Sequence, residues 1–513
     1  MRRAAIAAAL LLMSFLSWKV FPGHTWLQQD TQIYAPILEH LRDPQVLSRD
    51  ILVEHPHVSF TLYDELTLGL VKLTGLGLEP VLDGLQIVFR AVGLWGVFLI
   101  AESLGLETGP ALLLVLLWSL GATAKGPEVL TVEYEAVPRG FAFPLLMLAV
   151  GFASRANWRL SGFATAAAVL IHPPTVWPVL LIYLGHRRWQ ALAPVAGAVV
   201  VLAAVAKFET GGSESQHFFA VLPPALEALQ RMRAAYNWID TWWLEFLPQY
   251  VFLSFLIWLA VRRLPVRQEL RAFAYGLPVL ALLSVPSTFL TLNVGKWALL
   301  PQLQPMRALL FITALGSVLL AAAGCVAVRE RKYAEAFLWM LVPALPMHTN
   351  LFRPPTAIHA LVWLSLTGVL VLAVRHLWLI PAAAGAYWVM AATVVLYPQM
   401  HAAVIDDLAG WAAKNTPRDA VFLFADNGKA NAPGIFRAEA LRAVYVDWKG
   451  GGQVNYLPAF AEEWHRRWQA MRQTDGPHYA ALGVDYIVTS AGHEVPAAGK
   501  VYENSRYWVY KAK

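Results

Sequence analysis

The stretch "HTWLQQDTQIYAPILEHLRDP", residues 24–44, directly follows the first apolar run of the chain, which covers residues 4–20. It is the first polar cluster of the sequence, and it holds Asp30 with Tyr34 four residues later. Residues four apart share one face of a helix. A carboxylate a few residues beyond a membrane-spanning helix lies where lipid meets water. The stretch therefore predicts a polar site at the surface of a membrane.

The composition is that of a membrane protein. The chain has 513 residues, of which 58% are hydrophobic and 14% are charged, whereas soluble proteins carry about 25% charged residues. Apolar runs of roughly 15 to 22 residues recur from residue 4 to residue 397, and this is the length that crosses a bilayer. The single cysteine, Cys325, excludes a disulfide within the chain. No dense basic patch with interleaved aromatic residues occurs, which argues against a nucleic-acid partner.

We predict an α-helical polytopic membrane protein with about thirteen spanning helices. The first is taken as an uncleaved helix, because no clear small-residue cleavage site follows its apolar middle. The runs at 160–172 and 175–185 are short and separated by "HPP", so a re-entrant hairpin is an alternative for this pair. The candidate spans are 4–20, 83–103, 109–123, 140–154, 160–172, 175–185, 190–206, 247–261, 272–292, 307–327, 335–347, 357–373 and 377–397.

Basic residues predict the orientation of these helices. Every second loop is short and basic, which is typical of cytoplasmic loops. The N-terminus is then cytoplasmic, and the longer alternate loops lie outside a bacterial inner membrane together with the C-terminal region. The inner positions are Arg2, Arg3, Arg155, Arg159, Arg187, Arg188, Arg262, Arg263, Arg267, Arg271, Arg329, Arg331, Lys332 and Arg375, and the outer loops are 21–82, 124–139, 207–246, 293–306 and 348–356.

Two domains are expected. Residues 1–397 form the membrane domain, with a large first outer loop at 21–82 whose segment "TLYDELTLGLVKLTGLG" has helical periodicity. Residues 398–513 form a small soluble α/β domain. In it we expect helices at "DDLAGWAAKN" and "LPAFAEEWHRRWQAMR", strands at "AVFLF", "AVYVDW" and "YIVTS", a hairpin at "KVYENSRYWVYKA", and turns at "ADNGKANAPG" and "KGGG".

Asp30 has two interpretations that are compatible with each other. Because a periodic segment follows it, Asp30 is a favourable helix N-cap. At a lipid–water boundary the pKa of a carboxylate rises, and Asp30 would then take a proton from a hydroxyl group brought to the same surface.

The overall plan resembles the GT-C superfamily of polytopic glycosyltransferases. The shared features are a first helix, a large outer loop that opens with an acidic residue, many further helices and a soluble tail outside; "DTQIY" is similar to the Asp-x-x-x-Tyr pattern of bacterial polyprenol-dependent branches. The resemblance implies that Asp30 is the catalytic base. It also implies an inverting transfer of a hexosyl or pentosyl group from a polyprenyl-phosphate donor to a lipid, glycan or protein hydroxyl on the extracytoplasmic face. Gln29 and Thr31 flank Asp30, so a paired-acid metal site is not indicated and no cofactor is expected.

The second outer loop offers further candidate substrate-binding residues. In "KGPEVLTVEYEAVPRGFAFP", Glu133 and Glu135 share a face if the segment is extended. By the same resemblance, an acidic residue in this region binds the acceptor or a metal. The alternative is a solvated loop in which Arg139 pairs with a glutamate.

Some basic residues lie in the predicted outer loops or next to them, although the inner loops are the more strongly basic. Lys296 and Arg307 lie where a lipid-borne phosphate would be held, because a guanidinium binds phosphate through parallel hydrogen bonds and an ammonium acts as a point charge. The alternative is contact with lipid headgroups. Gln302 and Gln304 would bind sugar hydroxyls, and Arg353 is a further cation on this side. His172, and Asp447, Trp448 and Lys449 before "GGG", are either site residues or ordinary turns.

Two other functional classes stay open from the sequence. A transporter or lipid flippase would place charged residues inside the helices, and Arg90 and Glu102 are the main examples here. A non-catalytic partner in cell-envelope glycan assembly would use the tail for binding alone.

Overall fold

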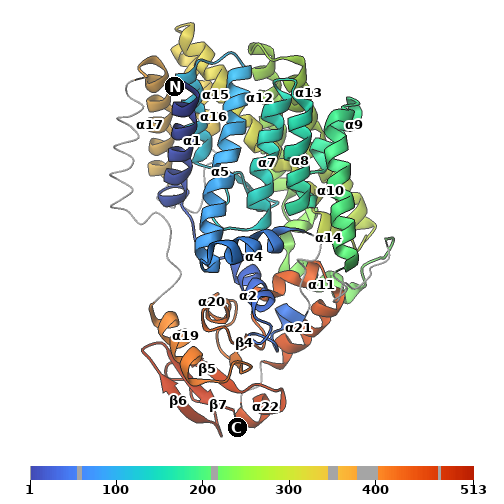
Figure 1. The fold of residues 1–513 in the computed structure, drawn as a ribbon, viewed down its shortest axis with the longest axis vertical. Coiled ribbons are helices and arrows are strands. Elements are labelled where there is room, and N and C mark those ends of the chain that lie inside the picture. The colour runs from blue at the N-terminus through green and yellow to red at the C-terminus, as the bar shows by residue number, and fades with distance from the viewer. Residues whose placement is uncertain are drawn as a thin grey trace.

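The computed structural model describes residues 2–54, 61–208, 218–344, 356–377, 403–471 and 475–512. Long helices run side by side in a bundle, and a smaller module of strands and short helices lies at one end of it (Figure 1). The N-terminus lies at the far end of the bundle, and the C-terminus lies in the module.

All but the last of the candidate spans coincide with a helix, and the last, 377–397, falls almost wholly outside the described residues. Among the residues that the structure describes, five helices are long and apolar enough to cross a membrane and four shorter apolar helices accompany them, so the full count stays a prediction. The bundle helices are α1 (Arg2–Lys19), α5 (Leu78–Ser103), α6 (Thr108–Ser119), α7 (Pro138–Ala153), α8 (Trp158–Ile171), α9 (Trp177–Gly185), α10 (Trp189–Phe208), α12 (Trp243–Arg263), α13 (Gln268–Thr288), α15 (Leu309–Arg329), α16 (Tyr333–Ala344) and α17 (Thr356–Arg375).

Helix α15 forms the centre of the bundle. Its residues are mostly apolar, and nearly all of those from Leu309 to Val328 are buried. A helix that is apolar on all sides either faces lipid or is covered by other helices, and α15 is covered, because it packs against α12, α13, α16 and α17. The bundle positions the site because η6 (Pro305–Ala308), which carries Arg307, leads directly into α15.

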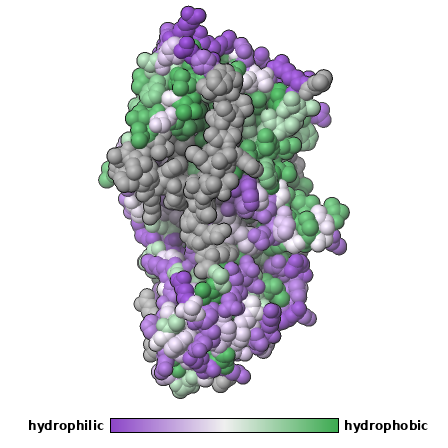
Figure 2. Space-filling view, turned by 90° about the vertical axis from the view of Figure 1, so that its left-hand side faces the viewer, coloured by the Kyte–Doolittle hydropathy of each residue, from purple (hydrophilic) through white to green (hydrophobic). Residues whose placement is uncertain are grey.

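The predicted inner loops gather at the end of the bundle that holds the N-terminus. Arg155 pairs there with Glu102, and Arg263 pairs with Glu330 and Glu335. The guanidinium of Arg188 lies 4.2 Å from the ring of Trp158, so α8 and α9 form a hairpin whose two ends meet on this side. On the face that Figure 2 shows, hydrophobic residues lie between a hydrophilic rim at the top and a mainly hydrophilic lower part. Which face is cytoplasmic stays a prediction.

The first outer loop forms short helices between the bundle and the module. As its periodicity predicts, one of them covers most of the "TLYDELTLGLVKLTGLG" segment. The helices of this loop are α2 (Thr31–Arg42), α3 (Ile51–Glu54) and α4 (Tyr63–Thr74). Other elements between the long helices are β1 (Thr123–Ala124), β2 (Val129–Leu130), η2 (Pro173–Thr175), α11 (Pro224–Arg233), η3 (Ala235–Asn237), η4 (Ile239–Thr241), η5 (Phe289–Val294) and α14 (Leu300–Leu303).

The C-terminal module is built on a mixed sheet in the order β4-β3-β5-β7-β6. Strand β3 runs parallel to β4 and β5, and β7 runs antiparallel to β5 and β6. The predicted strands, helices and hairpin are present, but α20 takes part of the segment expected to be a turn, and "GGG" begins a 3-10 helix, η7. The elements are α19 (Ala403–Asn415), β3 (Val421–Phe424), α20 (Ala432–Ala440), β4 (Ala443–Val444), η7 (Gly450–Asn455), α21 (Pro458–Ala470), α22 (Gly476–Ala481), β5 (Tyr486–Ser490), β6 (Gly499–Glu503) and β7 (Tyr507–Lys511).

Buried charges join the module to the first outer loop. The fully buried Arg437 donates to Asp50 over 2.7 Å and to Asp447 over 2.5 Å. Asp50 also accepts the backbone N–H of Val444, and Asp447 accepts that of Gly450. Since each charge has a partner, the cost of burying it is offset, whereas loss of one partner would leave an uncompensated charge. This network fixes the turn before η7 against the segment that carries Asp30.

Candidate active site

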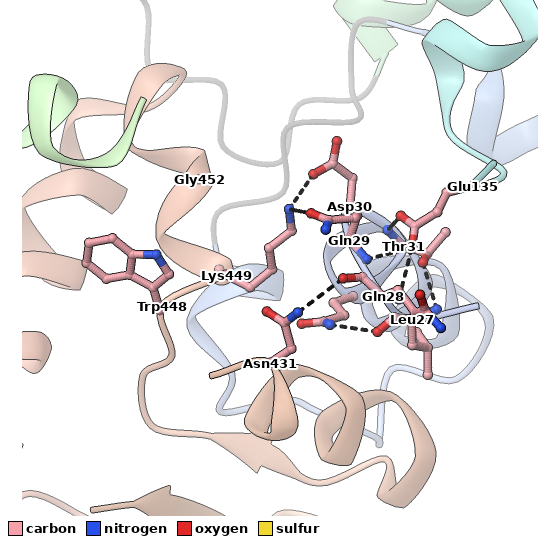
Figure 3. Close-up of polar contacts among 12 residues, drawn as sticks. Leu27, Gln28, Gln29, Asp30, Thr31, Glu135, Asn431, Trp448, Lys449 and Gly452 are labelled. Carbon is pink, nitrogen blue, oxygen red and sulfur yellow. Dashed lines mark hydrogen bonds and ion pairs between the residues drawn. The ribbon is translucent and has the colours of Figure 1, made fainter. Parts of the chain in front are cut away.

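Asp30 occupies the N-cap position of α2, but its side chain does not cap the helix. The carboxylate of Glu135 does so in its place, because it accepts the backbone N–H groups of Gln28, Gln29 and Thr31 over 2.9, 2.6 and 3.0 Å. Figure 3 shows Glu135 on one side of this turn and the Asp30 carboxylate on the side of Lys449. Glu135 therefore holds the loop, and the Asp30 side chain is left for other contacts.

Two cations hold the Asp30 carboxylate. Lys449 from the module lies 2.7 Å from one oxygen, and Arg139 from the start of α7 lies 2.6 Å from the other (Figure 3 shows the lysine). Burial alone would raise the pKa of Asp30, but Lys449 and Arg139 outweigh it and hold this pKa well below its ordinary value. The expectation of a raised pKa at the membrane boundary is wrong, because it considered the boundary without these two cations. Asp30 is ionised at neutral pH.

Arg139 links the two outer loops through their carboxylates. Its Nε lies 2.7 Å from Glu133, while its Nη1 is bound to Asp30. The predicted pairing of Arg139 with a glutamate is present, and the same guanidinium also reaches Asp30. Within the described ranges, no group of three histidine, cysteine, aspartate or glutamate residues is placed to hold a metal ion.

A cavity of about 400 Å³ opens beside these residues, between the end of the bundle and the module. The predicted site residues that line it are Asp30, Tyr34, Glu133, Glu135, Arg139 and Arg307, and His172 also lines it. Lys449, Gln453 and Tyr456 line it from the module, and Arg233 and Tyr236 line it from the third outer loop. The cavity therefore joins groups that are far apart in the sequence, and it is polar on most sides.

Arg307 is a cation without a carboxylate partner among the residues that the structure describes. Its guanidinium lies 5.5 Å from the ring of Tyr236, and its buried Nε has no hydrogen-bond partner in the described ranges. Arg307 also lines a small adjoining pocket, whose other lining residues include the apolar Phe143 and Leu310 and the charged Glu133 and Arg139. It thus borders both the polar cavity and a smaller pocket that is partly apolar.

Several other predicted residues lie away from the cavity. Lys296 pairs with Glu227 over 2.6 Å and does not line the cavity. Gln304 is buried, and its side-chain amide lies 3.5 Å from the hydroxyl of Tyr456. Gln302 donates to the backbone carbonyl of Tyr456. Arg353 falls outside the described residues.

Sequence reasoning missed the contribution of the third outer loop. Arg233 is the last residue of α11 and Tyr236 lies in η3, and neither was among the predicted site residues. The sequence predicts Lys449 as a site residue or as part of an ordinary turn, and it implies no contact between Lys449 and Asp30. The only sequence feature that could have pointed to a packed position for Lys449 is the glycine run after it, because glycine permits close packing.

Comparison with known proteins identifies the architecture. The crystal structure of ArnT from Cupriavidus metallidurans bound to undecaprenyl phosphate matches with a TM-score of 0.52 at 13% identity, over 99% of this chain and 98% of that one. The chain has the GT-C fold. Apo ArnT matches with a TM-score of 0.50, also at 13% identity, over 99% of this chain and 97% of that one.

Other comparisons cover less. The mycobacterial arabinofuranosyltransferase AftD has a TM-score of 0.48 at 14% identity, and this chain, matched over its full length, spans 40% of that protein. A domain of unknown function, DUF6798, matches residues 404–471 of the GT-C chain. No curated protein sequence matches this chain.

Proposed function

We propose that this GT-C protein is a membrane glycosyltransferase that moves a sugar from a polyprenyl-phosphate donor to an acceptor hydroxyl, with inversion, on the extracytoplasmic face. The observation that carries the proposal is the presence of Asp30 and of the unpaired Arg307 in one cavity at the polar end of an apolar bundle. Lipid-linked substrates reach such a place through the membrane, and the structure of ArnT contains undecaprenyl phosphate.

In the proposed reaction, the acceptor oxygen attacks the anomeric carbon as the bond from that carbon to the phosphate oxygen breaks. The hydroxyl proton passes to an oxygen of Asp30, which keeps free lone pairs beside its two cations. The polyprenyl phosphate leaves as an anion, and Arg307 stabilises the charge that develops on it. One displacement from the opposite face inverts the anomeric centre.

The low pKa of Asp30 makes it a weak base until the donor binds. A phosphate in the same cavity opposes the field of Lys449 and Arg139, and a nearby negative charge raises the pKa of a carboxylate. Donor binding would therefore increase the basicity of Asp30 when the acceptor is present. Arg139 supplies a fixed positive charge between Asp30 and Glu133 in this scheme.

The residues that suggested a transporter have structural roles. Arg90 donates to the backbone carbonyls of Gly23 and Glu133, and so ties both outer loops to α5. Glu102 pairs with Arg155 at the end of the bundle opposite the module. Neither residue lines the cavity near Asp30, which favours the enzyme over a transport path.

The substitution Asp30→Asn tests the proposal. In membranes supplied with radiolabelled undecaprenyl-phosphate hexose or pentose, we expect transfer into acceptor to fall by at least roughly a hundredfold, the usual scale for loss of a general base. Asp43→Asn is the matched control, because Asp43 ends the same helix and pairs with Arg418 at the exposed surface. Equal transfer by the wild type and Asp30→Asn, at equal protein abundance, would remove Asp30 as the base.

A further inference from the structure

A second arginine faces the same cavity from the side of the module. Arg233 is the last residue of α11, and its guanidinium lies 3.7 Å from the ring of Trp448 and donates to the Trp448 carbonyl. It forms no ion pair with a described carboxylate, and its buried Nε has no hydrogen-bond partner among the described residues. Arg233 is thus a cation held by an aromatic ring and a carbonyl group.

The buried carboxylate of Asp447 acts on Arg233 through its charge, but no ion pair joins the two side chains among the described residues. Asp447 already accepts hydrogen bonds from Arg437 and from the backbone of Gly450. Burial lowers the pKa of Arg233 to about 10, although Asp447 and Tyr236 oppose this effect. The side chain is therefore still charged at neutral pH while being partly removed from water. A partly desolvated charge without a counter-ion is unfavourable, and an incoming anion would relieve that cost.

Lysine side chains extend this positive charge outward. The ammonium group of Lys429 lies 4.5 Å from the ring of Trp448, its side chain is exposed, and it makes no ion pair within the described ranges. Lys449 follows Trp448 and enters the cavity itself. Trp448 therefore lies among three cations, of which only Lys449 has a carboxylate partner.

Arg231, on the same helix, shows the contrast. It pairs with Glu227 over 2.9 Å and with Asp240 over 3.0 Å. One arginine of α11 thus has carboxylate partners, whereas Arg233 forms no ion pair among the described residues. Arg307 also has no carboxylate partner among the described residues. The two arginines differ in their surroundings, because Arg307 borders the small pocket that contains Phe143 and Leu310, whereas Arg233 packs against Trp448 of the module. The two unpaired arginines serve different sides of one cavity.

We propose that Arg233 binds an anionic group, a carboxylate or a phosphate, on the acceptor, so that the acceptor is an acidic hydroxyl compound. The inference rests on the proposed transferase function and adds the chemical class of its second substrate. A guanidinium suits this task because its donors match both oxygens of a carboxylate or phosphate. Arg307 is left for the lipid phosphate. The other source of an anion at Arg233 is a second phosphate on the donor.

The test measures binding to the full-length protein in nanodiscs of phosphatidylcholine. The acidic probe is tetragalacturonic acid, and its fully methyl-esterified form is the neutral match. We expect the acid to bind at least roughly tenfold more tightly than the ester, and Arg233→Gln to remove this preference, since hydrogen bonds between charged groups carry about that much. Arg231→Gln is the matched control, and Arg233→Lys, which keeps the charge, should keep part of the preference. Equal binding of acid and ester, or binding of neither, would overturn the proposal.

A second arm separates the two sources of the anion. Undecaprenyl phosphate and undecaprenyl diphosphate are titrated against the wild type, Arg233→Gln and Arg307→Gln. We expect Arg307→Gln to weaken both lipids at least roughly tenfold and Arg233→Gln to leave both unchanged. If Arg233→Gln weakens only the diphosphate, the anion belongs to the donor and the acceptor assignment is wrong. Failure of either lipid to bind the wild type would count against the transferase itself, whatever the acidic probe does.

Discussion

Lys449 reaches Asp30 from more than four hundred residues away along the chain, over 2.7 Å. It is one of two cations that hold the pKa of Asp30 below its ordinary value. In Lys449→Gln only Arg139 would remain, so the pKa of Asp30 should rise. The base acts when ionised, and the low-pH limb of kcat/KM should therefore move to higher pH by roughly one unit, which corresponds to ~1.4 kcal/mol. A pH profile of sugar transfer measures this shift.

Lys500→Gln serves as the control, because Lys500 is an exposed lysine of the same module that pairs with Glu503. Its profile should match that of the wild type. A limb that stays in place or moves to lower pH in Lys449→Gln would show that Lys449 does not set the ionisation of Asp30.

At the residue scale, the sequence was enough to identify Asp30 as the candidate base, but it was not enough to predict the direction of its pKa shift. Asp30 stood out because it follows an apolar helix and precedes a periodic segment. Its partners lie in α7 and in the module, at positions that no spacing rule connects to residue 30. The pKa of Asp30 was therefore predicted in the wrong direction. Lys296 attracted attention as an outer cation, yet Glu227 from another loop pairs with it.

At the scale of the element, η7 holds Lys449 in place through close packing of its glycines. A Cβ atom on Gly451 would lie 2.4 Å from the ring of Trp464 and 2.8 Å from Nε of Arg233, whereas one on Gly452 would lie 3.7 Å from Ile33. We expect Gly451→Ala to lower the free energy of unfolding by about 1–3 kcal/mol, as overpacking does, and to displace Lys449 from Asp30. Thermal unfolding in detergent and the transfer assay measure both effects.

Gly452→Ala is the matched substitution next door, with ordinary contact distances. It should unfold at the wild-type temperature and keep transfer activity. Wild-type behaviour of Gly451→Ala would mean that η7 adapts and does not fix the lysine.

Element positions were predicted well where a strong period exists and poorly where tertiary contacts decide. Apolar runs gave α5, α13 and α15 to within a few residues, because the bilayer imposes their length. The run "KGGG" suggested a flexible turn, since glycine has no side chain to pack. In the folded chain the lack of a side chain is what lets Trp464 and Asp447 approach, so the same residues form an ordered helix.

At the scale of the whole molecule, the two ends of the bundle differ in how their charged residues are paired. Paired arginines mark the end with the N-terminus, and the cavity with its unpaired arginines lies at the other end, against the module. The loop pattern predicted this division because it depends on the position of basic residues and not on the count of helices. The union of module and first outer loop through Asp50, Arg437 and Asp447 could not be predicted, since a buried ion network joins segments with no sequence signal in common.

The orientation of the whole molecule can be tested with the single native cysteine as a silent background. Cys325 is buried within α15, so it should not react with a membrane-impermeant maleimide. We expect Glu494→Cys in the module to be labelled in spheroplasts, where the outer face of the inner membrane is accessible. Arg331→Cys, at an exposed position between α15 and α16, should be labelled only after the membrane is opened. The opposite pattern would place the cavity with Asp30 in the cytoplasm and would remove the extracytoplasmic acceptor, while a transferase acting on the inner leaflet would stay possible.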